Sequence, residues 1–427
     1  MQEASLIQRG ISKVSGAEPR EAGALLWGFA WFFFLLLSYF ILRPIRETLG
    51  VERGISGLKW LFTATFVVML VAVPLYSGLV GRMSRRRLVP FVYLFFIFNL
   101  LLFWAALSAG GALRAFAADT YFVWLSVFNL FAVSIFWSFQ ADLFSSEQAK
   151  RLFGFLAAGG TLGAICGSIV AAELAPVIGT TNLILIPAVF LGLSLLCMRR
   201  LDTHGQALRG EPEASSSEGT GGGLLDGFFA TFRSPYLLAI AAYMLCNALL
   251  GTTVYFQQME IVKETIQAEA ERLAFFARLN LWVQCATVVI QVLVTARLLK
   301  AVGVAAALCI LPCLYAVGVG ALGMVPTLTV LAIVDVVRRS ATYAISGPSR
   351  EVLFTSVTRS EKYKAKSFID TAVFRGGDAL AGHAFNALRG AGIGLVTVMV
   401  PVAALWAWIG HKAGRMHQAE ARGEGKA

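Results

Sequence analysis

Long apolar runs, separated by short polar connections, make up most of this chain. A helix needs about 20 apolar residues to cross the hydrocarbon core of a bilayer, so each run of that length predicts one transmembrane helix. We therefore expect an all-α integral membrane protein. The runs predict twelve spanning helices, near residues 25–45, 58–80, 88–108, 120–142, 152–173, 176–197, 235–258, 273–296, 302–323, 326–347, 367–388 and 391–411.

The longest polar break, residues 199–226, separates six predicted helices from the next six. Its centre, GEPEASSSEGTGGG, has the composition of a flexible linker. Two six-helix halves are typical of secondary transporters built from repeats. We expect a cytoplasmic tail at 1–24, an N-terminal half at 25–198, a cytoplasmic linker at 199–226, a C-terminal half at 227–412 and a cytoplasmic tail at 413–427.

A short motif occurs at corresponding places in the two halves. SSEQAKRLFGFLAAGGTLG follows the fourth predicted helix and RSEKYKAKSFIDTAVFRGGDALAG the tenth; both run from Ser-Glu-x-x-Lys into a Gly-Gly pair. The loop GLVGRMSRRR resembles the signature loop of the major facilitator superfamily, although Gly81 replaces its usual acid and Ser84 its usual glycine. An ordinary basic anchor is the alternative interpretation of this loop. Together with twelve helices and a linker, the motifs indicate a major-facilitator-like fold.

Basic residues are concentrated in the even-numbered connections between the predicted helices, whereas Arg114 and Arg389 are the isolated basic residues of two odd-numbered ones. The positive-inside rule therefore places both termini in the cytoplasm, and we expect a multi-pass protein of a bacterial inner membrane. Membrane topology accounts for most of the formal net charge of +11, so we expect the lipid bilayer and no nucleic acid as a partner.

A cluster of charged residues closes the first predicted helix. Arg43, Arg46 and Glu47 stand three and four residues apart, so they share one side of the helix. A charge at the bilayer centre costs roughly 2.5–3.5 kcal/mol on the insertion scale, so such residues face a partner or a water-filled path. Basic side chains that reach lipid headgroups are the alternative. Because two arginines and an acid lie beside Pro44, we favour a pore-facing cluster.

Two further helix ends carry polar candidates. Gln140 and Asp142 end the fourth predicted helix, and Glu260 and Lys263 follow the seventh. A helix cap is the alternative role for Asp142, and a weak surface pair with Lys263 is the alternative for Glu260.

Asp335, Arg338 and Arg339 lie inside the tenth predicted helix. The spacing of three and four residues predicts that Asp335 pairs with both arginines on one helix face. Two cations against one acid leave an excess positive charge, which an anionic ligand could neutralise.

The residue patterns that are typical of enzymes and metal centres are scarce in this sequence. The chain has four histidines, of which only His383 lies in the interior of a predicted helix. Its six cysteines lie in or at the ends of predicted helices without metal-ligand spacing. No Gly-rich phosphate loop or nucleophile motif occurs in the sequence. We therefore expect neither an enzyme nor a cofactor, and unpaired cysteines.

At its charged segments the chain resembles the non-mitochondrial ATP/ADP translocases, the nucleotide transporters of plastids and intracellular bacteria. That family has Lys-Asp-Thr-Leu, Phe-Trp-x-Phe-Ala-Asn-Glu, Glu-Ala-Lys-Arg, Asn-Leu-Val-Glu, Lys-Tyr-Ser-Leu-Phe-Asp-Pro-x-Lys-Glu and Lys-x-Lys-x-x-Ile-Asp. The corresponding stretches here are RETL (46–49), FWSFQAD (136–142), EQAKR (147–151), QQME (257–260), TYAISGPSRE (342–351) and KAKSFID (364–370). The resemblance runs over all twelve predicted helices.

The resemblance implies a substrate site built on a quartet of charges, which maps onto Arg46, Asp142, Glu260 and Lys366. The sign of each charge matches, but Arg46 replaces a lysine and Asp142 a glutamate, and Thr342 replaces a family lysine. ATP binding and ATP/ADP antiport are what the family suggests, and another phosphorylated or carboxylated metabolite is the alternative substrate.

We therefore expect a secondary transporter, a monomer, that moves a small organic anion by alternating access and exchange. Cations from both halves would hold the anion, because closing unpaired cations into low dielectric is costly. A proton-coupled carrier with Asp142 or Glu260 as its protonation site, and a transport-inactive sensor or scaffold, are the alternatives. The predicted binding residues are Arg43, Arg46, Glu47, Gln140, Asp142, Glu260, Arg339, Lys366, Asp370 and Arg375.

Overall fold

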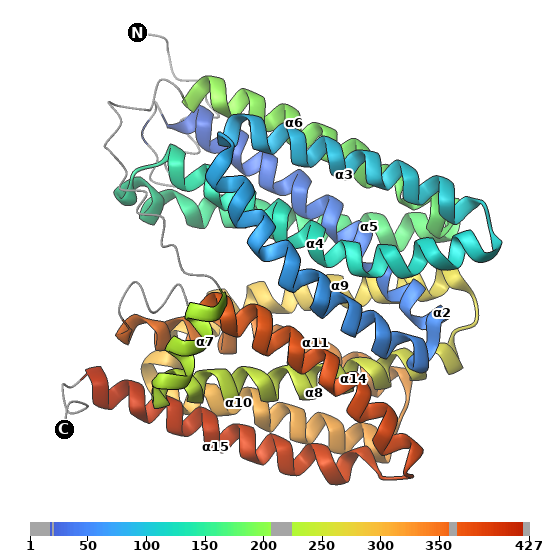
Figure 1. Ribbon diagram of the computed structural model, residues 1–427, viewed down its shortest axis with the longest axis vertical. Helices are drawn as coiled ribbons and strands as arrows, with labels where there is room; N and C mark the ends of the chain where they lie inside the picture. Colours follow the sequence, from blue (N-terminus) through green and yellow to red (C-terminus); the bar gives the residue numbers. More distant parts are fainter. Residues whose placement is uncertain (1–17, 19–20, 206–223, 358–364, 422–427) are drawn as a thin grey trace. The chain divides into compact units, whose positions relative to one another are not determined.

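The computed structural model describes residue 18 and residues 21–205, 224–357 and 365–421, and these residues form helices and connections without a strand. The α-helices are α2 (Ala22–Arg82), α3 (Arg85–Ser108), α4 (Gly111–Leu143), α5 (Ser146–Leu183), α6 (Leu185–Gly205), α7 (Leu224–Arg233), α8 (Pro235–Thr265), α9 (Glu269–Ile290), α10 (Ala296–Met324), α11 (Leu328–Ala341), α12 (Gly347–Leu353), α14 (Phe374–Gly390) and α15 (Leu395–Ala421) (Figure 1). Short π or 3₁₀ turns are η2 (Gln291–Thr295), η3 (Thr342–Ser346), η4 (Phe354–Ser356) and η5 (Ile369–Val373).

The expected all-α membrane fold is confirmed, although several predicted helices join into longer ones. Within the described residues, seven helices are long and apolar enough to cross a membrane, and two of these, Ala22–Val80 and Glu269–Met324, each contain two predicted spans. Gly54 breaks the first with φ 71°, and Gly303 breaks the second with φ 74°. Glycine adopts this left-handed backbone without a steric penalty, so the chain changes direction there. Within these two long helical segments, the other residues between the apolar runs remain helical.

Some predicted segments lie outside the described residues. These are most of the N-terminal tail, the centre of the linker at 206–223, the residues 358–364 that begin the second copy of the repeated motif, and the end of the C-terminal tail.

The chain folds into two compact units. Unit 1 comprises Met1–Leu49, Leu75–Ser216 and Ala268–Leu281, and unit 2 comprises Gly50–Pro74, Ser217–Gln267 and Trp282–Ala427. Each unit therefore contains most of one predicted half together with a segment of the other.

In unit 1, the first half of α2 packs against α4 in an antiparallel register. Phe32 stacks on Phe136 with ring centroids 4.2 Å apart, and Trp31 meets Phe136 edge to face at 5.0 Å. The α5 helix approaches the same half of α2 through glycines spaced four residues apart: a Cβ on Gly159 would lie 2.7 Å from the carbonyl oxygen of Phe29. Small residues permit such close helix contacts in membranes.

In unit 2, α8 lies in the core among α10, α14 and α15 (Figure 1). Tyr243 donates a hydrogen bond to the carbonyl oxygen of Leu308, and its ring packs on the buried Trp406. The Gly-Gly pair of the second motif copy, Gly376–Gly377, allows a close helix contact as Gly159 does in the first copy. A Cβ on Gly377 would lie 2.8 Å from the Cβ of Ala248 on α8. The repeated motif thus supplies a close helix contact in both units.

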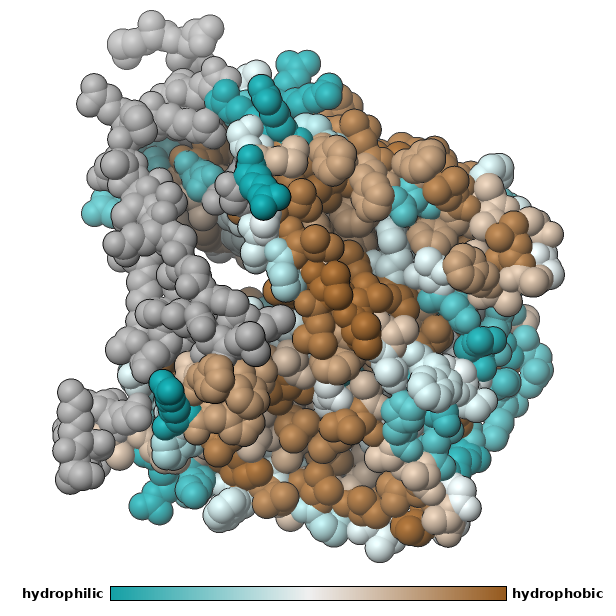
Figure 2. Space-filling view, viewed as in Figure 1, coloured by the Kyte–Doolittle hydropathy of each residue, from teal (hydrophilic) through white to brown (hydrophobic). Residues whose placement is uncertain are grey.

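Apolar side chains also cover much of the outer surface. Figure 2 shows broad apolar areas on the face in view. On α3, the exposed side chains include Phe91, Phe95 and Phe98. A surface this apolar exceeds what a water-soluble monomer normally exposes and is suited to contact with lipid.

Candidate functional site

The charged cluster of unit 1 lies at the end of the straight part of α2. Arg43 Nε lies 3.8 Å from Glu47 Oε1, which is a loose ion pair of neighbouring helical turns. Arg46 has no such partner among the described residues: its guanidinium stacks on the Phe122 ring, 4.0 Å from the centroid, and its Nε is buried without a hydrogen-bond partner. A cation over an aromatic face retains its capacity to bind an anion with its remaining N–H groups.

Gln140 lies far from Arg46, near the other end of the same helix pair. Its side chain is fully buried and neither its amide nitrogen nor its amide oxygen has a hydrogen-bond partner. Both atoms lie close to Gly28 of α2, where a Cβ would stand 3.4 Å from Nε2 and 3.5 Å from Oε1. Gly28 and Arg46 are eighteen residues apart on α2, or roughly 27 Å at the helical rise per residue. Asp142, two residues after Gln140, is exposed on the last turn of α4.

The predicted pairing of Asp335 with both arginines is confirmed in unit 2. Asp335 is fully buried; one of its carboxylate oxygens binds Arg338 Nη2 and the other lies 3.1 Å from Arg339 Nη1. Arg338 Nη1 also donates to the Tyr315 hydroxyl at 3.0 Å. Tyr315, on α10, is a partner that the sequence pattern did not reveal.

A second group of charges in unit 2 surrounds Lys366. Lys366 Nζ donates to both oxygens of Glu351, at 2.8 and 2.7 Å. Arg350 Nη1 lies 2.9 Å from Asp370 Oδ1, and Arg350 Nη2 lies 3.3 Å from Glu351 Oε1. Glu351 lies outside the predicted span 326–347. Partial burial would raise its pKa, but Lys366 and Arg350 outweigh this effect and lower the pKa below its ordinary value.

Arg375 also has a carboxylate partner. Its Nη1 lies 3.3 Å from Asp378 Oδ2, and the hydroxyl of Thr252 on α8 donates to Asp378 Oδ1 at 2.6 Å. Asp378 is buried. The three-residue spacing between Arg375 and Asp378 would have been sufficient to suggest this pair from the sequence.

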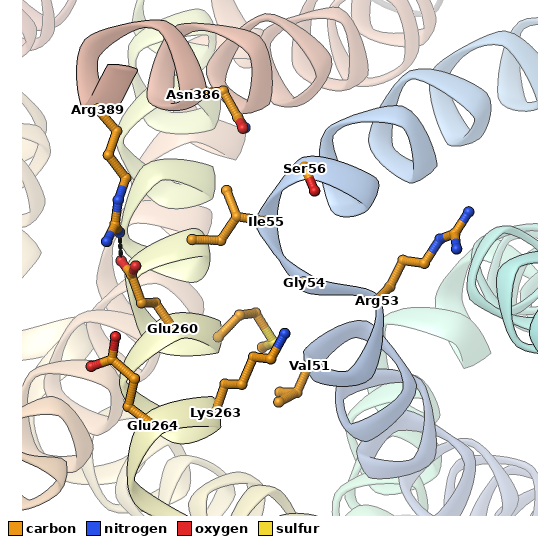
Figure 3. Close-up of a pocket in the computed structure, with 11 residues that line it drawn as sticks. Val51, Arg53, Gly54, Ile55, Ser56, Glu260, Lys263, Glu264, Asn386 and Arg389 are labelled. Atoms are coloured by element: carbon orange, nitrogen blue, oxygen red, sulfur yellow. Dashed lines mark ion pairs between the residues drawn. The ribbon is translucent and has the colours of Figure 1, made fainter. Parts of the chain in front are cut away.

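Glu260 pairs across helices rather than with its neighbour Lys263. Arg389 Nη1 on α14 binds Glu260 Oε2 on α8. The pair lines a pocket of about 670 Å³ within unit 2, between the ends of α8 and α14 and the turn of α2 at Gly54 (Figure 3). Its lining residues are Val51, Arg53, Gly54, Ile55, Ser56, Met259, Glu260, Lys263, Glu264, Asn386 and Arg389.

Metal binding finds no support in the part of the chain that the structure describes, where no group of three or more His, Cys, Asp or Glu side chains could hold an ion. His383 instead lies 3.0 Å from the Thr63 hydroxyl and packs edge to face on Trp60.

The predicted site residues therefore fall into several places. Unit 1 has Arg43, Arg46 and Glu47 together, with Gln140 and Asp142 at the other end of the helix pair. In unit 2, Lys366 and Asp370 share one charge group, whereas Arg339, Arg375 and Glu260 each belong to another. Four residues that sequence reasoning missed neutralise predicted ones: Arg350, Glu351, Asp378 and Arg389.

Comparisons with known proteins agree with the membrane fold. The family model described as Major Facilitator Superfamily matches residues 23–364. ADP,ATP carrier protein 1 of Chlamydia muridarum (strain MoPn / Nigg) is 20% identical over 426 residues, covering 82% of this chain and 78% of the relative. The protein of the same name from Chlamydia trachomatis serovar D is also 20% identical, over 82% of this chain and 79% of the relative.

Solved structures with a similar fold are transporters. A bacterial homologue of the iron transporter ferroportin, in an inward-facing state, has a TM-score of 0.63 at 13% identity. The match covers 92% of this chain and 98% of the homologue's chain. The nucleoside transporter NupG has a TM-score of 0.59 at 15% identity, with 92% and 99% covered. At these identities the likeness concerns the fold.

Proposed function

This chain belongs to the major facilitator superfamily, and we propose that as a transporter it carries an organic anion, a nucleotide or another phosphorylated metabolite. The carrier works by alternating access and exchanges one anion for another. The low-identity likeness to ADP,ATP carrier proteins favours nucleotides among the anions.

The single observation that carries the proposal is the state of Arg46. It is a half-buried cation on an apolar helix, it has no carboxylate partner among the described residues, and it is held on the Phe122 ring with Nε unpaired. Unpaired cations in such positions are expensive and mark binding sites. A phosphate group would satisfy the guanidinium with charge-assisted hydrogen bonds in a planar, bidentate geometry.

Arg339, Lys366 and Arg375 would take part through competition with carboxylates. Each holds a carboxylate at 3.3 Å or less, from Asp335, Glu351 or Asp378. A phosphorylated substrate that reaches these cations must displace a carboxylate, and the carboxylate returns when the substrate leaves. Such pairs would provide alternating partners for the same cations during the transport cycle.

Exchange follows from the unpaired cation. Moving Arg46 into a closed, low-dielectric interior without an anion leaves a buried charge uncompensated, which is strongly unfavourable. A bound anion removes that penalty in both directions of the cycle. In this proposal the protein is a monomer of a bacterial inner membrane with both termini in the cytoplasm, and ATP or ADP is its first candidate substrate.

Uptake into proteoliposomes tests the proposal. Thermal-shift measurements against nucleotides, sugar phosphates and organic acids first identify a ligand, because a specific binder stabilises the folded state by about 2.7 kcal/mol at a hundredfold excess over Kd. Arg46→Gln should then abolish uptake of that ligand while the protein remains folded, and Arg46→Lys should retain part of it. Arg200→Gln, which removes an exposed arginine of α6, is the matched control.

Preloaded vesicles should take up label many-fold faster than empty ones, with little response to a pH gradient. Normal uptake by Arg46→Gln would refute the proposed site. If empty vesicles accumulate the anion when the outside is acidified, proton coupling replaces exchange, with Asp142 or Glu260 as candidate relays. No uptake of any ligand by the folded protein would favour a sensor or scaffold.

A further inference from the structure

The pocket beside Gly54 is distinct from the Arg46 cluster, and all of its lining residues belong to unit 2. Its volume of about 670 Å³ lies within the range of about 300–1,000 Å³ that is typical of small-molecule sites. Three helix ends build it: the break of α2, the last turns of α8 and the last turn of α14.

Lys263 is the most available cation of this pocket. Its ammonium extends toward the turn of α2 (Figure 3), where a Cβ on Gly54 would stand 3.2 Å from Nζ. Because Gly54 has no side chain, the ammonium can lie directly against the backbone turn. Lys263 is exposed, and its side chain forms no ion pair or hydrogen bond within the described residues.

Arg389 is a second cation of the pocket, and it forms an ion pair with Glu260. The side chain of Arg389 is half exposed, whereas that of Glu260 is largely covered. Asn386 lies one turn before Arg389 on the same face of α14; its amide nitrogen donates to the Gly382 carbonyl oxygen at 2.9 Å, which orients the side chain. Arg389 can therefore exchange the Glu260 carboxylate for another anion without leaving the pocket.

The remaining lining combines apolar and charged groups. Val51, Ile55 and Met259 provide an apolar side, and Arg53 and Glu264 complete the charged residues. The side chain of Arg53 points away from the other charged lining residues (Figure 3), so Lys263 and Arg389 are the cations that a ligand in the pocket would meet, and Arg389 is matched by Glu260. A ligand that complements this lining has a phosphate or carboxylate group at one end and an apolar or aromatic part at the other.

We propose that this pocket is a second anion-binding site, at the end of unit 2 that the positive-inside rule assigns to the outside. Lys263 binds the anionic group of the ligand, Arg389 joins it by releasing Glu260, and Val51, Ile55 and Met259 contact the apolar part. The site binds the anion before the anion reaches the transport site. The proposal rests on the proposed function in one respect: it takes the bound anion to be the transported one.

Local protection from alkylation tests this site directly. Ser56 lines the pocket and is exposed, so Ser56→Cys places a thiol at the site. The purified full-length protein in lipid-free detergent is treated with a maleimide, and modification of the peptide that contains position 56 is measured by mass spectrometry. The probes are AMP and inorganic phosphate. Because the readout is peptide-specific, the six natural cysteines do not interfere.

Both probes should slow alkylation of Cys introduced at position 56, and AMP should do so at a lower concentration because it also contacts the apolar side. Lys263→Gln should raise the concentration needed about tenfold or more, since it removes a charge-assisted contact. Lys263→Arg should retain protection. Glu260→Gln should lower the probe concentration needed for protection, because it frees Arg389 to bind the anion. If the Glu260–Arg389 pair had only a structural role, Glu260→Gln would not improve protection.

Protection must persist in the Arg46→Gln background, which separates this site from the transport site. If AMP protects equally with Lys263→Gln, or protects only when Arg46 is present, the second site does not exist. If the soluble probes have no effect and only nanodiscs that contain phosphatidylglycerol protect the thiol, the pocket binds a lipid headgroup and the proposal is wrong.

Discussion

Removing the buried acid Asp335 should unfold the protein, because it leaves two arginines without their shared partner. Both carboxylate oxygens are engaged, one with Arg338 and one with Arg339 at 3.1 Å, and the residue is fully buried. Removing one side of a buried ion pair costs about 3–5 kcal/mol. A protein has about 5–15 kcal/mol of net stability in total, so Asp335→Ala removes a large share of it.

The assay is the yield of monodisperse protein after membrane extraction, followed by thermal unfolding in detergent. After Asp335→Ala, Arg338 keeps only the Tyr315 hydroxyl, and its Nε is already buried without a partner. We therefore expect little folded protein. Asp335→Asn combined with Arg339→Gln removes one charge of each sign and should recover part of the yield.

A surface pair provides the matched control. Glu269 Oε2 lies 3.1 Å from Arg114 Nη2, and both side chains are about one-third exposed. Such partly exposed ion pairs contribute about 1 kcal/mol or less, so Glu269→Ala should leave the yield nearly unchanged. Normal yield and unchanged Tm for Asp335→Ala would refute the reasoning that a buried, uncompensated charge governs stability here.

Three further predictions concern packing, pH and a buried amide. Gly163→Ala should lower the Tm clearly, because the added Cβ would collide with the Phe33 carbonyl group. Gly154→Ala is the control and should leave the Tm unchanged, since nothing lies within 4 Å of a Cβ at that position. Equal Tm values for the two variants would contradict the close packing of α5 on α2. Because the pKa of Glu351 is lowered, its ion-pair stabilisation is fully present above the ordinary pKa of 4.5 and is lost as the pH falls through the lowered pKa. The Tm difference between wild type and Glu351→Gln, equivalent to about 1 kcal/mol or less at pH 7, should therefore shrink progressively as the pH is lowered below 4.5. A difference that stays constant with pH would argue against the ion pair. Gln140→Leu removes a buried amide without hydrogen-bond partners, so it should raise the stability by about 1 kcal/mol while reducing uptake; a fall in Tm would mean that the amide has partners.

The sequence predicted the helices well because membrane burial acts on local composition. The apolar runs are helical over most of their length, since the backbone has no other way to satisfy its hydrogen bonds in lipid. The predicted helix 176–197 is the exception: Gly179, with φ 78°, interrupts it, and it is divided between α5 and α6. What composition could not show is which connections remain helical. Residues 46–53 include four charged side chains and Gly50, yet α2 continues through them and breaks only at Gly54.

The sequence also predicts ion pairs within one helix better than ion pairs between helices. The pairs of Asp335 with Arg338 and Arg339 could be predicted, because helical spacing alone brings them together. Glu260 and Arg389 lie on different helices, and only the packing of α8 against α14 decides that they meet. Sequence spacing offered Lys263 as an alternative partner of Glu260, but a three-residue spacing does not fix the side-chain direction.

The antiparallel register of α2 and α4 has a consequence for kinetics. Arg46 and Gln140 are separated by roughly 27 Å along this helix pair, close to the thickness of the hydrocarbon core, so one small molecule cannot touch both at the same time. Residues this far apart act independently, and the effects of substituting them add as free energies. If both bind the substrate, each acts on a different step of its passage, and the double variant should be slowed by the product of the two single effects.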